Sequence, residues 1–241
     1  MRGLLIEYVC MPKKLHAGNL VILSYNLRFH MAYEEAFKLA RANKAEVICL
    51  QECYTNVLEK EIDGYVLAGK TRGPLGLAVY YRPRRLTLRY AKSSILTPSI
   101  YERISTEGGE RLLVAKFDDL KTQKPVFIAS FHATHLVASN FHRRKQLKEA
   151  FAFLEQHNPA ARQAPVVIAG DYNYPWFHGR LRNLVEAHDY TLHVSKEPTL
   201  KNSVLEGRFD LISARHVKNI DLKVLDRGIS DHMAICATVR Y

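Results

Sequence analysis

Residues 126–173 read VFIASFHATHLVASNFHRRKQLKEAFAFLEQHNPAARQAPVVIAGDYN, and this stretch holds the pattern from which the fold is predicted. The runs 126–131 and 166–170 are short and rich in Val, Ile and Phe, which is typical of strands buried on at least one face. Between them, 143–157 places its apolar residues together on one face of a helix. A strand, a helix and a second strand in this order favour a layered domain in which helices cover a sheet.

The same pattern continues in both directions along the chain. Further strands are predicted at 20–25, 47–51, 77–82, 112–117, 209–213 and 233–239, and further helices at 32–44 and 177–188. Internal repeats and linkers rich in Gly, Pro or Ser are absent from the sequence. We therefore predict an N-terminal arm, residues 1–18, and one domain of class α/β (α+β), residues 19–241.

The composition excludes several classes of protein. The longest apolar runs are far shorter than the roughly 18 to 20 residues of a membrane-spanning helix. The N-terminus has neither the apolar core nor the cleavage site of a secretory signal, so we expect a cytoplasmic protein. The four cysteines form no CxxC pair, which argues against a zinc site or a disulfide scaffold. Cys49, inside an apolar run, is interpreted as a small core residue.

The charge balance points to an anionic partner. Lys and Arg number 35 against 24 Asp and Glu, a formal net charge of +11. Such a surplus attracts polyanions, which include nucleic acids and anionic membranes.

Polar residues follow the predicted strands at the points where these strands end. They are Asn26, Glu52, His132, His135, Asp171 and Asn173, and Asp231 and His232 directly precede the last predicted strand. Each alone has a bland interpretation, as a helix cap, a turn residue, a surface carboxylate or a core histidine. Together they supply oxygen ligands for Mg²⁺ or Mn²⁺, a histidine that can move protons, and amide donors for phosphate oxygens.

The motifs SYN (24–26), LQE (50–52), THL (134–136), GDYN (170–173) and SDH (230–232) occur in this order. This ordered set resembles that of the endonuclease/exonuclease/phosphatase superfamily, the DNase I-like fold, in the branch that carries a THL motif. The resemblance spans residues 20–239 and implies a four-layer sandwich, in which two mainly antiparallel sheets are flanked by helices.

The resemblance also implies a divalent metal ion, Mg²⁺ or Mn²⁺. Its ligands are expected to be Glu52 of LQE, Asn26 of SYN and Asp231 of SDH. One or two carboxylates with several waters suit Mg²⁺, which dehydrates reluctantly.

The resemblance assigns the catalytic roles as well. His232 matches the general base or phosphate-contacting histidine, and Asp210 matches the aspartate that orients it. Asp171 is expected to position or activate the attacking water, and Asn173 to donate to a phosphate oxygen. His135, in THL, matches a second histidine that contacts the phosphate. His132 is set aside because it lies outside that motif, and His30 and His142 are interpreted as solvated surface residues.

The expected substrate is a nucleic acid, with DNA favoured over RNA. Basic clusters at 82–90, 141–148 and 178–183 each concentrate arginine or lysine, and the last two follow catalytic motifs. The residues expected to contact nucleic acid are Arg143, Arg144, Arg180, Arg182, Tyr174 and Trp176. The alternative interpretation of each cluster is a solvated face of a helix or hairpin.

Alternatives to a nuclease remain open. The same chemistry serves phospholipid, phosphoinositide and tyrosyl-DNA phosphodiesterases, and the fold also permits a catalytically inactive binding module. The resemblance implies a monomer. We expect no stable membrane association, because the sequence shows no exposed apolar loop.

Overall fold

The computed structural model of the chain describes residues 19–73, 75–99, 109–157, 159–202 and 205–241. The arm predicted over residues 1–18, and Cys10 within it, lie outside the described residues.

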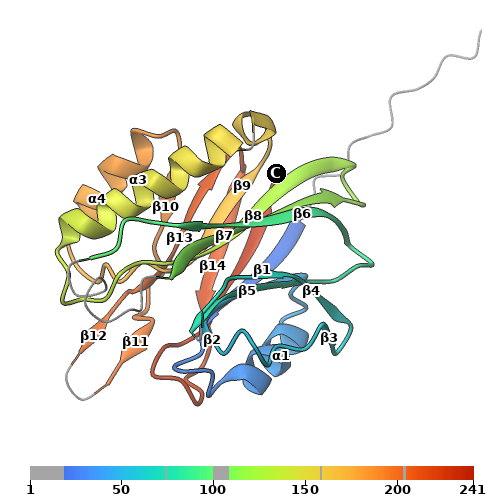
Figure 1. Cartoon of the computed structure of the whole chain (residues 1–241), viewed down its shortest axis with the longest axis horizontal. Helices are drawn as coiled ribbons and strands as arrows, with labels where there is room; N and C mark the ends of the chain where they lie inside the picture. The colour runs from blue at the N-terminus through green and yellow to red at the C-terminus, as the bar shows by residue number, and fades with distance from the viewer. Residues whose placement is uncertain (1–18, 74, 100–108, 158, 203–204) are drawn as a thin grey trace, which may run out of the picture.

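Two packed sheets form the centre of the fold (Figure 1). The first sheet has the order β14 (Asn219–Val224), β15 (Ile235–Arg240), β1 (Asn19–Asn26), β2 (Val47–Cys53), β5 (Gly76–Tyr81), β4 (Tyr65–Lys70) and β3 (Glu61–Ile62). The second sheet has the order β10 (Thr191–His193), β13 (Asp210–Arg215), β9 (Val166–Asp171), β8 (Lys124–His132), β7 (Glu110–Asp119) and β6 (Leu86–Ile95). A short ribbon pairs β11 (Leu200–Lys201) with β12 (Glu206–Gly207).

Helices cover the two outer faces and complete the four-layer sandwich (Figure 1). Helix α1 (Tyr33–Ala42) packs on the first sheet, while α3 (Asn140–His157) and α4 (His178–Glu186) pack on the second. A short 3-10 helix, η1 (Pro159–Arg162), follows α3. The predicted fold class is confirmed.

Each sheet contains one parallel pair of strands within an otherwise antiparallel order. The pairs are β1–β2, connected through α1, and β8–β9, connected through α3. A parallel connection requires such a crossover, usually a helix on the outer face of the sheet. The carboxyl ends of the two strands in each pair therefore lie at the same edge of their sheet.

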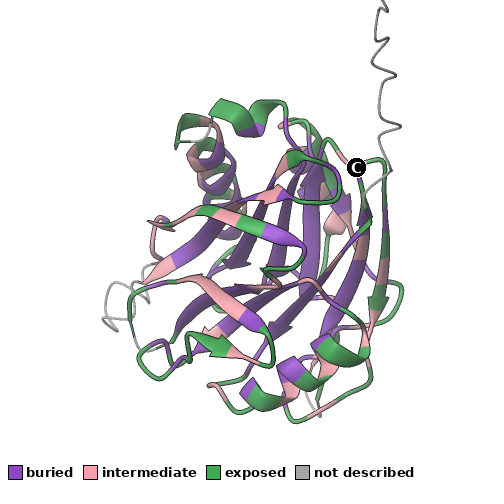
Figure 2. Ribbon diagram, turned by 90° about the vertical axis from the view of Figure 1, so that its right-hand side faces the viewer, coloured by how far each residue is buried: buried purple, intermediate pink, exposed green. Residues whose placement is uncertain are grey.

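Because side chains alternate between the two faces of each strand, the buried apolar residues form three separate cores. One lies between the sheets, and the others lie under α1 and under α3 with α4. Cys49 is fully buried between the sheets, as its interpretation as a core residue requires. In Figure 2 the strands are largely buried, while exposed residues concentrate on loops and on the outer faces of the helices.

The interior between the sheets changes from apolar to polar toward one edge. Ser24, Gln51 and Ser130 are buried there, and Gln51 Nε2 donates to Ser130 Oγ at 2.9 Å and to Ser24 Oγ at 3.3 Å. Buried polar side chains need such partners, because an unpaired group in the interior is costly. This small network joins the two sheets directly beneath the strand ends that carry the predicted site residues.

Several elements differ from their predicted bounds. Helix α3 begins at Asn140 rather than at 143, and α4 spans His178–Glu186 rather than 177–188. The strands β3, β4, β6, β10, β11, β12 and β14 were not predicted. Apart from β4, they are short or carry alternating polar residues, as in the half-exposed β14.

Candidate active site

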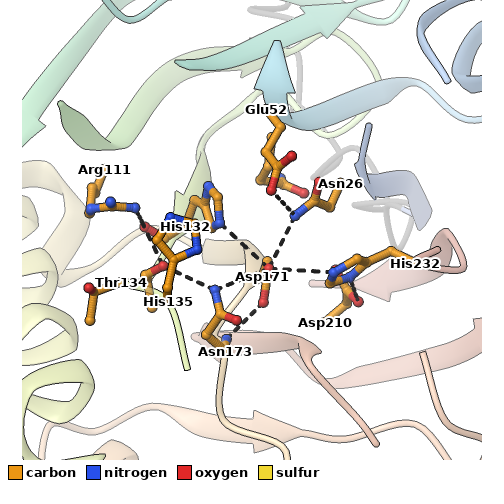
Figure 3. A network of polar contacts seen from close by, with 12 residues as sticks. Asn26, Glu52, Arg111, His132, Thr134, His135, Asp171, Asn173, Asp210 and His232 are labelled. Atoms are coloured by element: carbon orange, nitrogen blue, oxygen red, sulfur yellow. Dashed lines mark hydrogen bonds and ion pairs between the residues drawn. The ribbon is translucent and has the colours of Figure 1, made fainter. Parts of the chain in front are cut away.

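The candidate site lies where the polar ends of the two parallel pairs meet (Figure 3). Register places His132 of β8 and Asp210 of β13 on either side of Asp171 at the end of β9. From the first sheet, Asn26 of β1 reaches across to Asp171, with Nδ2 and Oδ2 3.1 Å apart. Each sheet therefore contributes half of the site.

Asp171 is the centre of the network in Figure 3 and is almost completely buried. Its Oδ1 accepts from the Asn173 backbone N–H at 2.8 Å, and its Oδ2 accepts from Asn173 Nδ2 at 3.2 Å. The nearest histidine nitrogens, His132 Nε2 and His232 Nε2, lie 3.6 and 3.8 Å from Oδ2. Burial raises the pKa of Asp171, and the neighbouring His232 opposes this shift only in part.

The residue before Asp171 must be glycine. Gly170 has φ +155°, and a Cβ atom there would lie 1.8 Å from the carbonyl oxygen of Phe131 on the neighbouring strand. Only a residue without a side chain permits so close a backbone approach. The glycine of GDYN is therefore required for β9 to bring Asp171 into the site.

His232 is oriented by a buried carboxylate. Its Nδ1 lies 2.9 Å from Asp210 Oδ2, which directs Nε2 toward Asp171. The backbone N–H of Asp210 donates to Thr199 Oγ1 at 3.0 Å, which holds this strand end in place. Burial alone would lower the pKa of His232, but the charges of Asp210 and Asp171 outweigh burial and raise that pKa.

Ser230 joins the SDH segment to the first sheet. Its Oγ donates to the Asn26 carbonyl at 2.8 Å and accepts from the His232 backbone N–H at 3.1 Å. One hydroxyl thus holds two predicted site residues in register.

Glu52 lies at an irregularity in β2, with φ +56°. Its Oε1 accepts from Asn26 Nδ2 at 3.1 Å, and its Oε2 accepts from the Phe29 backbone N–H at 2.9 Å. A positive φ is uncommon for a residue other than glycine and persists only where the surroundings impose it. The half-buried carboxylate is consequently held at the mouth of the site.

The donor set fits a hard divalent cation. The carboxylates of Glu52 and Asp171 both accept from the single Asn26 amide nitrogen, and the charge of Glu52 contributes to the raised pKa of Asp171. A bound cation would relieve this accumulation of negative charge. Within the described residues, no three His, Cys, Asp or Glu side chains form a closed cage, so water would have to complete the shell of an ion such as Mg²⁺.

Asp231 lies further out than the other predicted ligands. It is half-buried, and its Oδ1 is 3.8 Å from Arg28 Nε. The structure therefore places it beside the site rather than within the hydrogen-bonded network around Asp171.

Of the two histidines near the THL motif, the structure places His132 beside Asp171, whereas the sequence favoured His135. His132 is buried beside Asp171, whereas His135 is exposed, with its ring centroid 6.2 Å from that of His132. Alternation along β8 could have shown this, because His132 shares the inward face with Val126, Ile128 and Ser130. His135 lies at the rim of the adjoining cleft.

Arg111 was not predicted as part of the site. Its Nη1 donates to the carbonyl oxygens of His132 at 3.2 Å and Ala133 at 3.4 Å. No motif marks it, because an arginine at the start of β7 acquires its role only through the pairing of β7 with β8.

A cleft of about 470 Å³ opens beside Glu52. Its lining combines Arg72, Arg111, His132 and His135 with the apolar side chains Phe29, Leu75 and Ile95. Glu52 and Glu110 also line it, so the cleft combines side chains of both charges with an apolar wall.

The six residues predicted to contact nucleic acid divide into three groups. Trp176 and Arg180 are exposed. Arg144 and Arg182 are half-buried; Arg144 Nη1 donates to Tyr174 Oη at 2.8 Å, and Arg182 Nη1 donates to the Leu192 carbonyl at 3.1 Å.

The remaining two are structural. Arg143 is buried and donates to the His135 carbonyl at 2.7 Å, so it shapes the loop after β8. Tyr174 is only 1% exposed, and its ring is unavailable for stacking on a base. Both side chains are buried, so this structure does not present them to a nucleic acid. His30 and His142, expected to be solvated, are half-buried and hydrogen-bonded.

Within the described part of the chain, no helix has both the length and the apolar character needed to cross a membrane.

Comparisons with known proteins place this site in context. A family model described as "Endonuclease/Exonuclease/phosphatase family" matches residues 23–232. A search of curated proteins gave no match.

Several solved structures share the fold. A Bacteroides vulgatus endonuclease/exonuclease/phosphatase aligns with a TM-score of 0.71 and 13% identity, covering 92% of this chain and 98% of its own. The Bacteroides thetaiotaomicron mannosyl-6-phosphatase Bt3783 aligns at 0.67 and 16%, covering 92% and 100%. D. rerio TDP2 complexed with single strand DNA product aligns at 0.67 and 17%, covering 92% and 98%. At such identities the likeness concerns the fold alone.

Proposed function

Because the chain belongs to the Endonuclease/Exonuclease/phosphatase family, we propose that it is a divalent-metal-dependent phosphodiesterase that hydrolyses nucleic acid. Family members are hydrolases that act on phosphate esters and are generally dependent on divalent metals. The observation that carries the proposal is the convergence of Asn26, Glu52, Asp171, Asp210 and His232 at one polar edge of the sandwich.

Glu52 is the first candidate ligand for the metal, Mg²⁺ or Mn²⁺, with Asn26 beside it and Asp231 completing the shell directly or through water. When bound, the ion supplies positive charge that stabilises the negative charge developing on the phosphate and on the leaving oxygen. Asn26 also ties the metal side of the site to Asp171 through its amide nitrogen.

Asp171 is suited to accept the proton of the attacking water. Its raised pKa places the carboxyl closer to the working pH than an ordinary aspartate, which is the condition for efficient general-base catalysis. Both donor hydrogens of Asn173 Nδ2 point at Asp171 and at the Ala133 carbonyl, so Asn173 orients this base. Donation from Asn173 to a phosphate oxygen would require it to leave one of these partners.

His232 is suited to stabilise charge on the phosphate. Asp210 accepts the Nδ1–H and favours the imidazolium, whose Nε2–H can then donate to a phosphate oxygen. His132 lies on the other side of Asp171, and burial lowers its pKa, so it is suited to act as a neutral donor to the phosphate. His135, at the rim, remains a candidate contact to the leaving side of the substrate.

A nucleic acid is the substrate that the charge of the chain favours. The net charge of +11 attracts polyanions, and the exposed Arg180 and Trp176 offer a phosphate contact and a stacking surface near the site. We place DNA before RNA, and we keep a monomer in the cytoplasm as the working expectation.

Incubation with labelled single- and double-stranded DNA and RNA tests the proposal. Wild type and Glu52→Ala are compared in Mg²⁺, Mn²⁺ and EDTA, and the products are resolved as a ladder. Metal-dependent cleavage that the variant lacks is expected. Absence of cleavage on every nucleic acid, with activity on tyrosyl-DNA or phospholipid substrates instead, contradicts the nuclease assignment.

A further inference from the structure

The dipeptide Phe-His occurs four times in the chain. Phe131-His132 lies within β8 with its phenylalanine buried, and the other three lie outside the strands, around the site. Phe29-His30 follows β1, Phe141-His142 follows β8, and Phe177-His178 follows β9. Each lies where a strand that carries a site residue passes into the helix that covers its sheet. In all three, the phenylalanine is exposed and the histidine is directed inward.

His30 is held by two aromatic rings. Its imidazole stacks on Tyr33 at 4.5 Å and on Tyr54 at 5.2 Å between centroids, with interplanar angles of 21° and 17°. Its Nδ1 accepts from the Tyr54 backbone N–H at 3.2 Å. The loop after β1 is thereby fixed to the end of β2.

The other two histidines are held by main-chain carbonyls. His142 Nε2 lies 3.0 Å from the Thr97 carbonyl, and His178 Nε2 lies 3.4 Å from the Arg208 carbonyl. In each case the ring N–H donates and the histidine serves as an anchor.

The phenylalanines face solvent at considerable cost. Phe29, Phe141 and Phe177 are 57%, 69% and 68% exposed. Phe29 and Phe177 also adopt left-handed backbone conformations, with φ +54° and +62°. Bulky residues rarely occupy this region, and such strain persists only where the surrounding structure imposes it. The anchored histidines provide that constraint.

Exposed apolar side chains are concentrated at this one edge. The large apolar residues that are exposed at the site edge include the three phenylalanines, Trp176 and Ile229, whereas Leu120, in the β7–β8 turn, marks the opposite edge. Contiguous exposed apolar side chains commonly mark a binding surface.

An arginine accompanies each phenylalanine. Arg28 adjoins Phe29, and Arg144 and Arg180 lie three positions after Phe141 and Phe177. An aromatic face beside a guanidinium matches a nucleotide, whose base stacks on the ring while its phosphate meets the charge. The arrangement therefore repeats, at three points around the site, the elements that recognise an unpaired nucleotide.

We propose that Phe29, Phe141 and Phe177 form a stacking rim for unpaired bases, so that the substrate is a single strand or an unpaired strand end. This rests on the proposed function, and it names the form of nucleic acid that reaches the site. In a duplex the base faces are already stacked on one another and cannot meet these rings. The catalytic groups are also recessed, because Asn26, Asp171 and His232 are all buried, and a flexible single strand can bend into such a recess more easily than a stiff duplex.

Fluorescence anisotropy in EDTA, where hydrolysis is prevented, tests the rim. The probes are a labelled oligothymidylate of about 15 nucleotides and a blunt duplex of the same length. Phe141→Ser, Phe177→Ser and the double variant are compared with wild type, and Leu120→Ser serves as the matched control at the opposite edge. Each rim substitution is expected to weaken single-strand binding about tenfold, with the control within about twofold of wild type. Wild type is expected to bind the duplex more weakly than the single strand.

The anchors have a test of their own. His142→Ala is expected to weaken single-strand binding as Phe141→Ser does, whereas His142→Gln, which retains an N–H donor, restores binding. Hydrolysis of the small soluble diester bis(p-nitrophenyl) phosphate is expected to be unchanged in the Leu120→Ser control, which shows that this control keeps an intact site.

Three results overturn the rim. The first is wild-type affinity of the double variant for oligothymidylate, and the second is tighter binding of the duplex than of the single strand by wild type. The third is a double variant that no longer binds phosphatidylserine-containing vesicles, although wild type does, while its oligothymidylate binding is unaffected. The last result assigns the surface to a membrane. If wild type binds as expected but hydrolyses no phosphodiester in Mg²⁺ or Mn²⁺, the proposed function fails and the rim stands.

Discussion

Replacement of Gly170 by alanine tests how closely β8 and β9 must approach for catalysis. The added Cβ would lie 1.8 Å from the Phe131 carbonyl oxygen, and the two must separate by at least about 1.2 Å to reach 3.0 Å, the lower limit of real Cβ contacts. Both strands are held in the second sheet by neighbours on either side, so the displacement cannot be confined to one residue.

The displacement acts directly on the base. Asp171 is the next residue, and misplacement of a catalytic group by about 1 Å can cost on the order of 10²-fold in rate. Overpacking of a buried position adds a loss of stability of roughly 1–3 kcal/mol. We therefore expect Gly170→Ala to lower kcat about a hundredfold and to lower Tm by several degrees.

Gly179→Ala is the matched control. A Cβ at Gly179 meets nothing within 4 Å, and the residue lies in the first turn of α4. Alanine favours the helix there by up to about 1 kcal/mol, so Tm should stay the same or rise and kcat should not change. The assays are thermal unfolding by circular dichroism and metal-dependent hydrolysis of a soluble diester. If Gly170→Ala retained wild-type kcat, close approach of the two strands would not be what positions Asp171.

Three further perturbations test other parts of the structure. His132→Ala should lower kcat for a soluble diester on the order of 10²-fold, and His135→Ala should lower it less than about tenfold. The reverse order would show that His135, the histidine of THL, is the one that acts on the substrate. Asp119→Ala removes the buried carboxylate that pairs with the buried Arg85 and leaves that arginine only the half-buried Glu46. It should cost roughly 3–5 kcal/mol in urea unfolding with kcat unchanged, whereas an unchanged midpoint would mean that the Arg85–Asp119 pair contributes nothing. Asp210→Asn should lower Tm most near pH 6 and least near pH 10. Asp210 raises the pKa of His232 in the folded protein to about 10, so the pair stabilises the fold fully below the unfolded pKa of about 6.5 and loses this effect as pH rises toward 10. A Tm difference between variant and wild type that grows with pH would contradict the assignment.

Strands buried on one or both faces were predictable from sequence because their apolar runs are continuous. Strand β9 is buried at every position, and its predicted bounds differ from the observed ones by a single residue. Strands β6 and β14 alternate between buried and exposed positions at the sheet margins and carry lysine or arginine. Of the basic residues of 82–90, which were interpreted as a polyanion-binding cluster, Arg85 is buried and paired with Asp119, and Arg89 is paired with Asp118.

The site was predictable where a motif and a strand end coincide. Asp171 and His232 satisfy both conditions, and the structure brings them together. The preference for His135 over His132 relied on the motif and ignored the alternation of β8, which places His132 beside Asp171. Arg143 and Tyr174 show a different limit. Only the packing of α3 against the loop after β9 buries them, and that contact is invisible in local sequence.

The position of β15 between β14 and β1 has a consequence for how the protein is made. Ser24 of β1 pairs with Ile235 of β15, so the ribosome must add about 210 residues before β1 meets this partner, which takes roughly 10 to 40 seconds. Throughout that interval β1 has an unpaired edge that can join another chain. The segment carrying His232 is made in the same late stretch, so a nascent chain cannot assemble the catalytic network before this strand is delivered. The timing delays assembly of this network until β15 has been made, and it makes β1 the segment that a chaperone would need to protect.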